Sequence, residues 1–121
     1  MPPLDYQQIV REFTQEHQLQ ISTVSRLLDL VAELGEVAKE ILESTHYGRE
    51  TFQPSKNWDA ELGDTFFSLI CLANSTQVNL DTALTQVLKK YQLRIAQKGS
   101  AASDATISSD ARQLDTTRKM T

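Results

Sequence analysis

Hydrophobic side chains recur every three or four residues along most of this chain, which is the spacing of amphipathic helices. No segment alternates hydrophobic and polar residues in the manner of a half-buried strand. The pattern predicts four helices, over about residues 4–17, 23–45, 57–75 and 80–95. Ser22 or Thr23 and Asn79 are suited to cap the second and fourth helices, and Gly48 to stop the second. The expected fold class is therefore all-α, in a four-helix bundle-like arrangement.

The composition changes after residue 98. Residues 99–121 consist mainly of Ser, Thr, Ala and Asp, with hardly any large apolar side chain. Such a segment cannot bury enough apolar surface to offset the entropy lost on ordering. We therefore expect one all-α domain over residues 1–98 and a flexible, disordered C-terminal tail over residues 99–121.

Charge and composition exclude several classes of function. The net charge is −4 and the longest basic cluster is Lys89-Lys90, which argues against a nucleic acid polymer as partner. The longest apolar run, around residues 66–73, is too short to cross a bilayer, so no membrane association is expected. The N-terminus has no signal-peptide pattern, and the single cysteine, Cys71, has no intrachain partner for a disulfide. A cytoplasmic location is expected.

The second helix carries a row of acids opposite its apolar residues. On a helical wheel these five side chains fall within roughly 80° of one another: Asp29, Glu33, Glu36, Glu40 and Glu43. A solvated face would normally interleave lysine or arginine. The row is either an exposed acidic face or a surface neutralised by a cation from outside.

The third helix favours the second interpretation, in which a cation neutralises the acids. Its apolar residues cover nearly every direction, so the helix is expected to be buried, yet Glu61, Asp64 and Ser68 form a polar stripe along it. Buried carboxylates are destabilising unless they are paired or bind a metal. Lysine and arginine are absent between Lys56 and Lys89. Carboxylates from two facing helices, without His or Cys, predict a site for Mg²⁺ or Mn²⁺.

The two acidic segments also repeat one another. AELGE at positions 32–36 and AELGD at positions 60–64 share a helical glycine, and together they read Glu33-x-x-Glu36, 24 residues, Glu61-x-x-Asp64. This double motif resembles the ExxE…ExxD signature of the all-α, MazG-type nucleoside triphosphate pyrophosphohydrolases, and the similarity extends over roughly residues 22–98. Ala32 and Ala60 stand where the family commonly has a further glutamate.

The resemblance implies Mg²⁺-dependent hydrolysis of a nucleoside or deoxynucleoside triphosphate to the monophosphate and pyrophosphate, in nucleotide-pool housecleaning. The motif match implies that Glu33, Glu36, Glu61 and Asp64 are the metal ligands. It also implies that basic residues of the last helix, Lys90 and Arg94, meet the phosphates. Spacing makes Glu36 and Glu40 the candidates for orienting the attacking water. Trp58, Tyr47 and Phe52 flank the acids and are candidates for stacking on the base.

A third helix that is apolar on nearly every side cannot be covered by three partner helices, so a homodimer or a dimer of dimers is expected.

Three other functions fit parts of the pattern. A ferritin-like di-iron bundle needs Glu-x-x-His pairs, and this chain has one, Glu43 to His46, where the second helix ends. A noncatalytic helical interaction module and a regulatory nucleotide-binding relative without turnover remain as alternatives.

Overall fold

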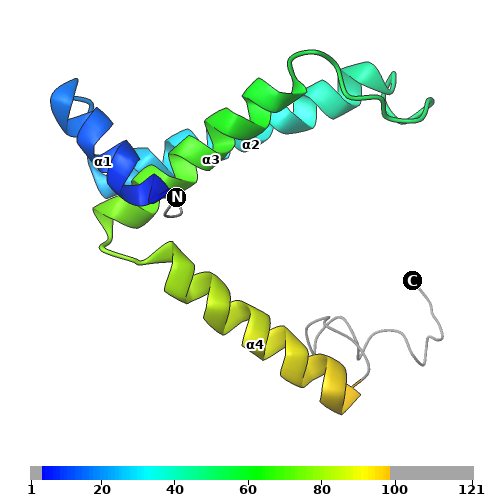
Figure 1. Ribbon diagram of the computed structural model, residues 1–121. Helices are drawn as coiled ribbons and strands as arrows, with labels where there is room; N and C mark the ends of the chain where they lie inside the picture. The colour runs from blue at the N-terminus through cyan, green and yellow to red at the C-terminus, as the bar shows by residue number, and fades with distance from the viewer. Residues whose placement is uncertain (1–3, 99–121) are drawn as a thin grey trace. The chain divides into compact units, whose positions relative to one another are not determined.

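The computed structural model describes residues 4–98 of the chain, and all regular structure in that range is helical (Figure 1). The helices are α1 (Tyr6–Glu16), α2 (Thr23–Ser44), α3 (Trp58–Ser75) and α4 (Leu80–Lys98). Residues 4–98 contain no strand, which confirms the all-α class, and each helix lies within a few residues of its predicted bounds. The tail predicted over residues 99–121 lies outside the described part of the chain.

The described helices fall into two units. The first, which ends at Leu80, contains α1, α2 and α3, and the second, from Asp81 onward, contains α4. In the first unit α2 and α3 run antiparallel along each other, and α1 packs on α3 (Figure 1). The Thr23 hydroxyl at the start of α2 donates a hydrogen bond to the Ser75 hydroxyl at the end of α3, at 3.2 Å. Within residues 4–98, no helix combines the length and the apolar character that crossing a bilayer requires.

Side chains cap the first two helices at their N-termini. The Asp5 carboxylate accepts from the backbone N–H of Gln8 at 3.0 Å, and the Ser22 hydroxyl accepts from the backbone N–H of Ser25 at 3.1 Å. Each bond satisfies a backbone donor that has no partner inside its helix. Of the two residues proposed to cap α2, Ser22 is therefore the cap.

The C-termini of α1, α2 and α3 share one motif. In each, a residue with positive φ follows the last turn: Gln18 at 56°, His46 at 50° and Gln77 at 59°. The next backbone N–H then reaches back five residues, as from Tyr47 to the Leu42 carbonyl oxygen at 2.7 Å. This is the Schellman arrangement, in which glycine usually occupies the left-handed position.

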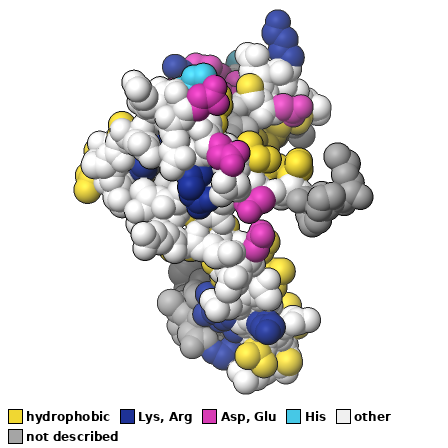
Figure 2. Space-filling model, turned by 60° about the vertical axis from the view of Figure 1, so that its left-hand side comes forward, with side chains coloured by type: hydrophobic (Ala, Val, Ile, Leu, Met, Phe, Trp, Pro, Cys, Tyr) yellow, Lys and Arg dark blue, Asp and Glu magenta, His cyan; other side chains and the backbone are white. Residues whose placement is uncertain are grey.

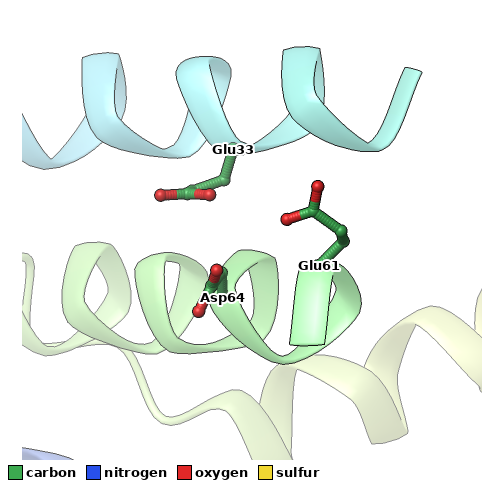
Figure 3. A group of neighbouring side chains, drawn as sticks. All are labelled: Glu33, Glu61 and Asp64. Carbon is green, nitrogen blue, oxygen red and sulfur yellow. The ribbon is translucent and has the colours of Figure 1, made fainter. Parts of the chain in front are cut away.

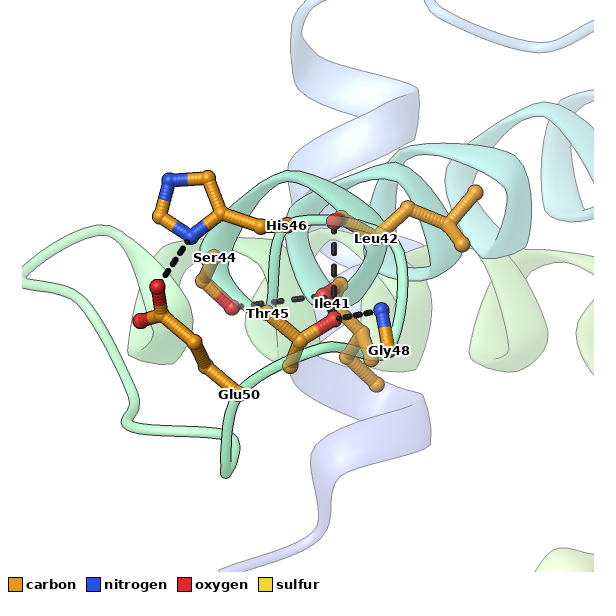
Figure 4. Close-up of polar contacts among 7 residues, drawn as sticks. All are labelled: Ile41, Leu42, Ser44, Thr45, His46, Gly48 and Glu50. Atoms are coloured by element: carbon orange, nitrogen blue, oxygen red, sulfur yellow. Dashed lines mark hydrogen bonds and ion pairs between the residues drawn. The ribbon is translucent and has the colours of Figure 1, made fainter.

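Gly48 is therefore not the residue that ends α2, contrary to the prediction. Figure 4 shows that Thr45 organises this end: its hydroxyl donates to the Ile41 carbonyl oxygen at 2.7 Å and accepts from the Gly48 N–H at 3.0 Å. Nearby, His46 Nδ1 lies 2.8 Å from Glu50 Oε2. The helix ends at Ser44 because Thr45 is the cap and the left-handed turn begins at His46.

Helix α1 packs on α3 through aromatic side chains and through hydrogen bonds of one glutamine, Gln7. The ring centroids of Tyr6 and Phe66 lie 5.6 Å apart, in an edge-to-face arrangement that aromatic pairs prefer. The Gln7 side chain donates to Asn74 Oδ1 at 3.0 Å and to the Val78 carbonyl oxygen at 2.7 Å, and accepts from the Leu80 N–H at 2.7 Å. One side chain of α1 thus secures the end of α3 and the turn that follows.

Burial of α3 is confined to its C-terminal half. Ile70, Cys71 and Ala73 are buried, with Ile70 only 2% exposed, whereas Leu62 and Phe66 nearer its start are 46% and 47% exposed. The expectation that α3 is buried on every side is therefore wrong for the first unit. The eleven-residue α1 is too short to run the length of α3, and α2 contacts one side of it.

Helix α2 turns two of its acids, Glu33 and Glu40, toward α3, whereas Asp29, Glu36 and Glu43 are exposed. Its least exposed residues recur at intervals of four and three: Arg26, Leu30, Glu33, Val37, Glu40 and Ser44. The apolar residues on the other side are exposed, with Val31 at 56% and Leu28 at 62%. Figure 2 shows hydrophobic side chains reaching the surface among polar ones. We call the exposed set the apolar face of α2: Val24, Leu27, Leu28, Val31, Leu34, Ile41 and Leu42.

Gly35 lies on the same side of α2 as the apolar face. Val37, two residues later, lies on the opposite side, which faces α3. A Cβ atom built at Gly35 would meet nothing within 4 Å, and the same holds for Gly63 in α3. Glycine inside a helix costs about 1 kcal/mol relative to alanine. Packing inside the first unit therefore does not account for either glycine.

The apolar face of α2 predicts self-association, as a homodimer or a dimer of dimers. Replacing Val31, at the centre of that face, with glutamate would place a charge in the interface. We expect Val31→Glu to lower the molar mass measured by light scattering at micromolar concentration to that of the monomer.

Ser25→Glu is the matched control, since it adds the same charge to the same helix outside the apolar face. A glutamate three residues after the Ser22 cap also suits the first turn of the helix. Its molar mass should equal that of the wild type. A wild-type protein that is monomeric in this measurement would show that the assembly does not exist.

Candidate metal centre

The two acidic pentads face one another across the α2–α3 pair. Glu33 extends from α2, and Glu61 and Asp64 extend from α3 toward it (Figure 3). One carboxylate oxygen from each of the three lies within 4.8 Å of the others. Glu33 and Glu61 are half-buried and Asp64 is exposed. We call these three residues the carboxylate cluster.

Without a cation, the ionised carboxylate of Glu33 is destabilised by its surroundings. Partial desolvation and the nearby charges of Asp64, Asp29, Glu61 and Glu36 raise the pKa of Glu33 above its ordinary value. The ion pairs within residues 4–98, Glu16 with His17 and Glu50 with His46, include no member of the cluster. Carboxylate oxygens that converge from two helices without a basic partner are suited to a hard divalent cation.

Glu36 and Glu40, the other acids of α2 singled out from the sequence, lie outside the cluster. Glu36 is exposed, although its charge is close enough to contribute to the raised pKa of Glu33. Glu40 is half-buried on the side of α2 that faces α3. It follows Glu33 by seven residues, a rise of about 10 Å along the helix. The structure thus brings together three of the four predicted metal ligands, with the fourth beside them.

The aromatic candidates differ in their surroundings. Trp58 opens α3, one turn before Glu61, and packs edge-to-face on Phe52 with the ring centroids 5.0 Å apart. Tyr47 is 74% exposed and sits in the left-handed turn after α2. Trp58 is therefore held near the carboxylate cluster, with Phe52 fixing the orientation of its ring.

The basic candidates belong to α4, which is described by itself. Lys90 Nζ lies 5.4 Å from the centre of the Tyr91 ring, and the Arg94 guanidinium carbon lies 5.8 Å from it. Both are within the range of a cation–π interaction. The two cations therefore share one aromatic neighbour on α4.

One charged residue was missed in the analysis of the sequence. Arg26 is only 7% exposed, although it lies in the first turn of a helix and the acid three residues along, Asp29, is itself exposed. It occupies the same side of α2 as Glu33 and Glu40, and that periodicity was the available signal.

Comparisons with known proteins agree with this geometry. A family model described as the MazG nucleotide pyrophosphohydrolase domain matches residues 21–97. The uncharacterized protein YpjD of Bacillus subtilis (strain 168) is 34% identical over 76 residues, which are 60% of this chain and 67% of that protein. A crystal structure of the Bacillus-conserved MazG protein, a nucleotide pyrophosphohydrolase, superposes with a TM-score of 0.61 at 29% identity, covering 75% of this chain and 93% of that one. The chain belongs to the MazG nucleotide pyrophosphohydrolase family.

Proposed function

We propose that this protein hydrolyses a nucleoside or deoxynucleoside triphosphate to the monophosphate and pyrophosphate with the help of Mg²⁺, as part of nucleotide-pool housecleaning. The observation that carries the proposal is the carboxylate cluster, in which three acids from the two pentads converge without a basic partner among residues 4–98. Family membership supports the reaction class.

Glu33, Glu61 and Asp64 are the proposed metal ligands, and Glu36 the proposed fourth. Mg²⁺, or Mn²⁺ in its place, would neutralise the cluster, bind phosphate oxygens and lower the pKa of a bound water. Glu36 lies three residues from Glu33, so a change of rotamer at an exposed side chain is sufficient to bring it in. The proposed four ligands would then come two from each helix.

The attacking water needs a residue to orient it and accept its proton. Glu36 and Glu40 are the proposed candidates, and the geometry favours Glu36. Its charge acts on Glu33, whereas Glu40 is about two helical turns further along α2. Attack at the α-phosphorus would release pyrophosphate, and a general base acts best within hydrogen-bond reach of the water.

The rest of the substrate would be held by residues outside the cluster. Trp58 is the proposed platform for the base, because Phe52 fixes its ring one turn from Glu61. Lys90 and Arg94 are the proposed phosphate contacts, where their positive charge would stabilise the leaving pyrophosphate. A nucleoside triphosphate is thus the proposed partner.

The position of cleavage tests the reaction. In ¹⁸O-labelled water with Mg²⁺ and a pool of nucleoside and deoxynucleoside triphosphates, we expect pyrophosphate and a monophosphate that carries the label. The label enters the monophosphate because water attacks the α-phosphorus. Mass spectrometry of the products reads the result directly. Orthophosphate and a nucleoside diphosphate would contradict the proposal, and no product at all would favour a noncatalytic binding module.

The metal site has its own test in melting curves with EDTA and with Mg²⁺. Wild type should gain about 2.7 kcal/mol when Mg²⁺ reaches a hundred times its dissociation constant. Asp64→Asn should melt no lower than wild type in EDTA, because it removes repulsion, yet it should lose most of the Mg²⁺ gain. Its turnover should fall by orders of magnitude.

Glu43→Gln is the matched control for that measurement. It also removes one negative charge, from an exposed position of α2 outside the cluster, and it should keep the full Mg²⁺ gain. Equal Mg²⁺ shifts in Asp64→Asn and wild type would show that the cluster does not hold the ion.

The raised pKa of Glu33 predicts a dependence of stability on pH in the metal-free protein. The folded state binds the Glu33 proton more tightly than the unfolded state, in which the glutamate pKa is about 4.3. This contribution to stability is complete below that value and is lost as the pH rises through the folded-state pKa. Glu33→Gln should therefore melt increasingly above wild type, in EDTA, as the pH rises from about 4.3 through the folded-state pKa of Glu33. A constant difference across this range would argue against the shift, and Glu43→Gln again serves as control.

A further inference from the structure

The first unit contains a cavity of about 310 Å³ where α1 meets the end of the α2–α3 pair. Two arginines line it, Arg11 from α1 and Arg26 from α2, and no aspartate or glutamate does. Neutral polar side chains complete much of its wall: Gln15, Gln20, Asn74 and Ser75. In a chain with a net charge of −4, a cavity lined by two cations and no acid is unusual.

Arg26 is buried without a counter-ion. Only 7% of the residue is exposed, and its guanidinium donates a hydrogen bond to the Leu19 carbonyl oxygen. Within the described residues Arg26 forms no ion pair, and the acid three positions along, Asp29, is exposed. A guanidinium has five N–H donors, and the bond to Leu19 uses one of them, on a side chain that lines the cavity. A buried charge without a partner is strongly destabilising, so an anion at this place would be bound favourably.

The second arginine has only neutral partners. The Arg11 guanidinium donates to Gln8 Oε1 at 2.7 Å and to Asn74 Oδ1 at 3.3 Å. Neither contact neutralises its charge, and both fix its position on the cavity wall. Two positive charges therefore meet in one place, on the wall of the cavity.

The cavity is separate from the carboxylate cluster. Arg26 precedes Glu33 by seven residues on α2, and Cys71, which lines the cavity, follows Asp64 by seven on α3. Each interval corresponds to about 10 Å along a helix. No member of the cluster lines the cavity, and the buried Ser68 lies between the two places on α3.

We propose that this cavity binds the phosphate group of a small anion through Arg11 and Arg26. Guanidinium groups match the geometry of phosphate oxygens, and planar forks of this kind bind phosphate in many proteins. A volume of about 310 Å³ lies at the small end of ligand pockets, which fits inorganic phosphate, pyrophosphate or a nucleoside monophosphate. The proposal goes beyond the hydrolysis of a triphosphate and does not depend on it.

The test is binding of inorganic phosphate to the full chain in EDTA, with chloride at equal ionic strength as the reference. Calorimetry should detect saturable phosphate binding, and phosphate should raise the melting temperature of the wild type. Arg26→Gln and Arg11→Gln should each raise the dissociation constant for phosphate at least tenfold. Arg49→Gln, which removes an exposed arginine that does not line the cavity, should bind as wild type does.

A second pair of variants separates this site from a structural role and from the carboxylate cluster. If Arg26→Gln fails to fold, Arg26→Lys replaces it in the test, because lysine keeps the positive charge. Arg26→Lys should retain phosphate binding with reduced affinity. Asp64→Asn should bind phosphate as wild type does, whatever happens to turnover. Parallel titrations with pyrophosphate and adenosine monophosphate distinguish the free ion from a phosphorylated metabolite. Equal effects of phosphate and chloride, or unchanged affinity in both arginine variants, would overturn the proposal.

Discussion

Across the contact between α2 and α3, the carboxylate of Glu33 meets the carboxylates of Glu61 and Asp64. The closest oxygens of Glu33, Glu61 and Asp64 lie within 4.8 Å, and the pKa of Glu33 is raised by partial desolvation and by its acidic neighbours. Repulsion of this kind opposes the association of the two helices, so other contacts must hold them. The hydrogen bond between Thr23 and Ser75 fixes one end of the pair, and α1 packs on α3 beside it. The proposed cation binding would therefore be coupled to stability through the same three side chains.

The same constraint explains the orientation of α2. If its apolar face met α3, Glu33 would point to solvent and could not converge with Glu61 and Asp64. Turning Glu33 and Glu40 toward α3 leaves Val31 and its neighbours exposed, and an exposed apolar surface of this kind is typical of a site that another element or another chain covers. Gly35 lies on that side of the helix with open space above it. The proposed assembly and the proposed metal site would therefore use opposite sides of one helix.

Charge is also distributed unequally along the α2–α3 pair. The acids gather near its middle, while Arg26 and Arg11 meet at the end where α1 packs. Both groups are left without oppositely charged partners among the described residues, and each therefore favours a ligand of the opposite sign. A divalent cation and a phosphate group are the ligands that we propose for these two environments.

Local sequence signals were sufficient for the helices. Periodicity and capping residues placed all four within a few residues, because a helix is stabilised by interactions between residues close in the chain. The two pentads likewise predicted that acids of α2 and α3 would meet, and Glu33, Glu61 and Asp64 do converge, while their role as metal ligands stays a prediction. The left-handed position at His46 was missed, since glycine two residues later gave a stronger local signal than the Thr45 hydrogen bonds that set the turn.

By itself, then, the sequence determined the helices, the helical class and the acids that are available to meet. Only the tertiary structure decided that Glu33 and Glu40 of α2 face α3, that Glu36 stays outside the cluster and that Arg26 is buried beside a cavity. The physical reason is that a helical wheel gives the sides of a helix but not their partners. Which side is buried depends on the free energy of all contacts between helices, including those with ligands and other chains, and these are properties of the packed molecule.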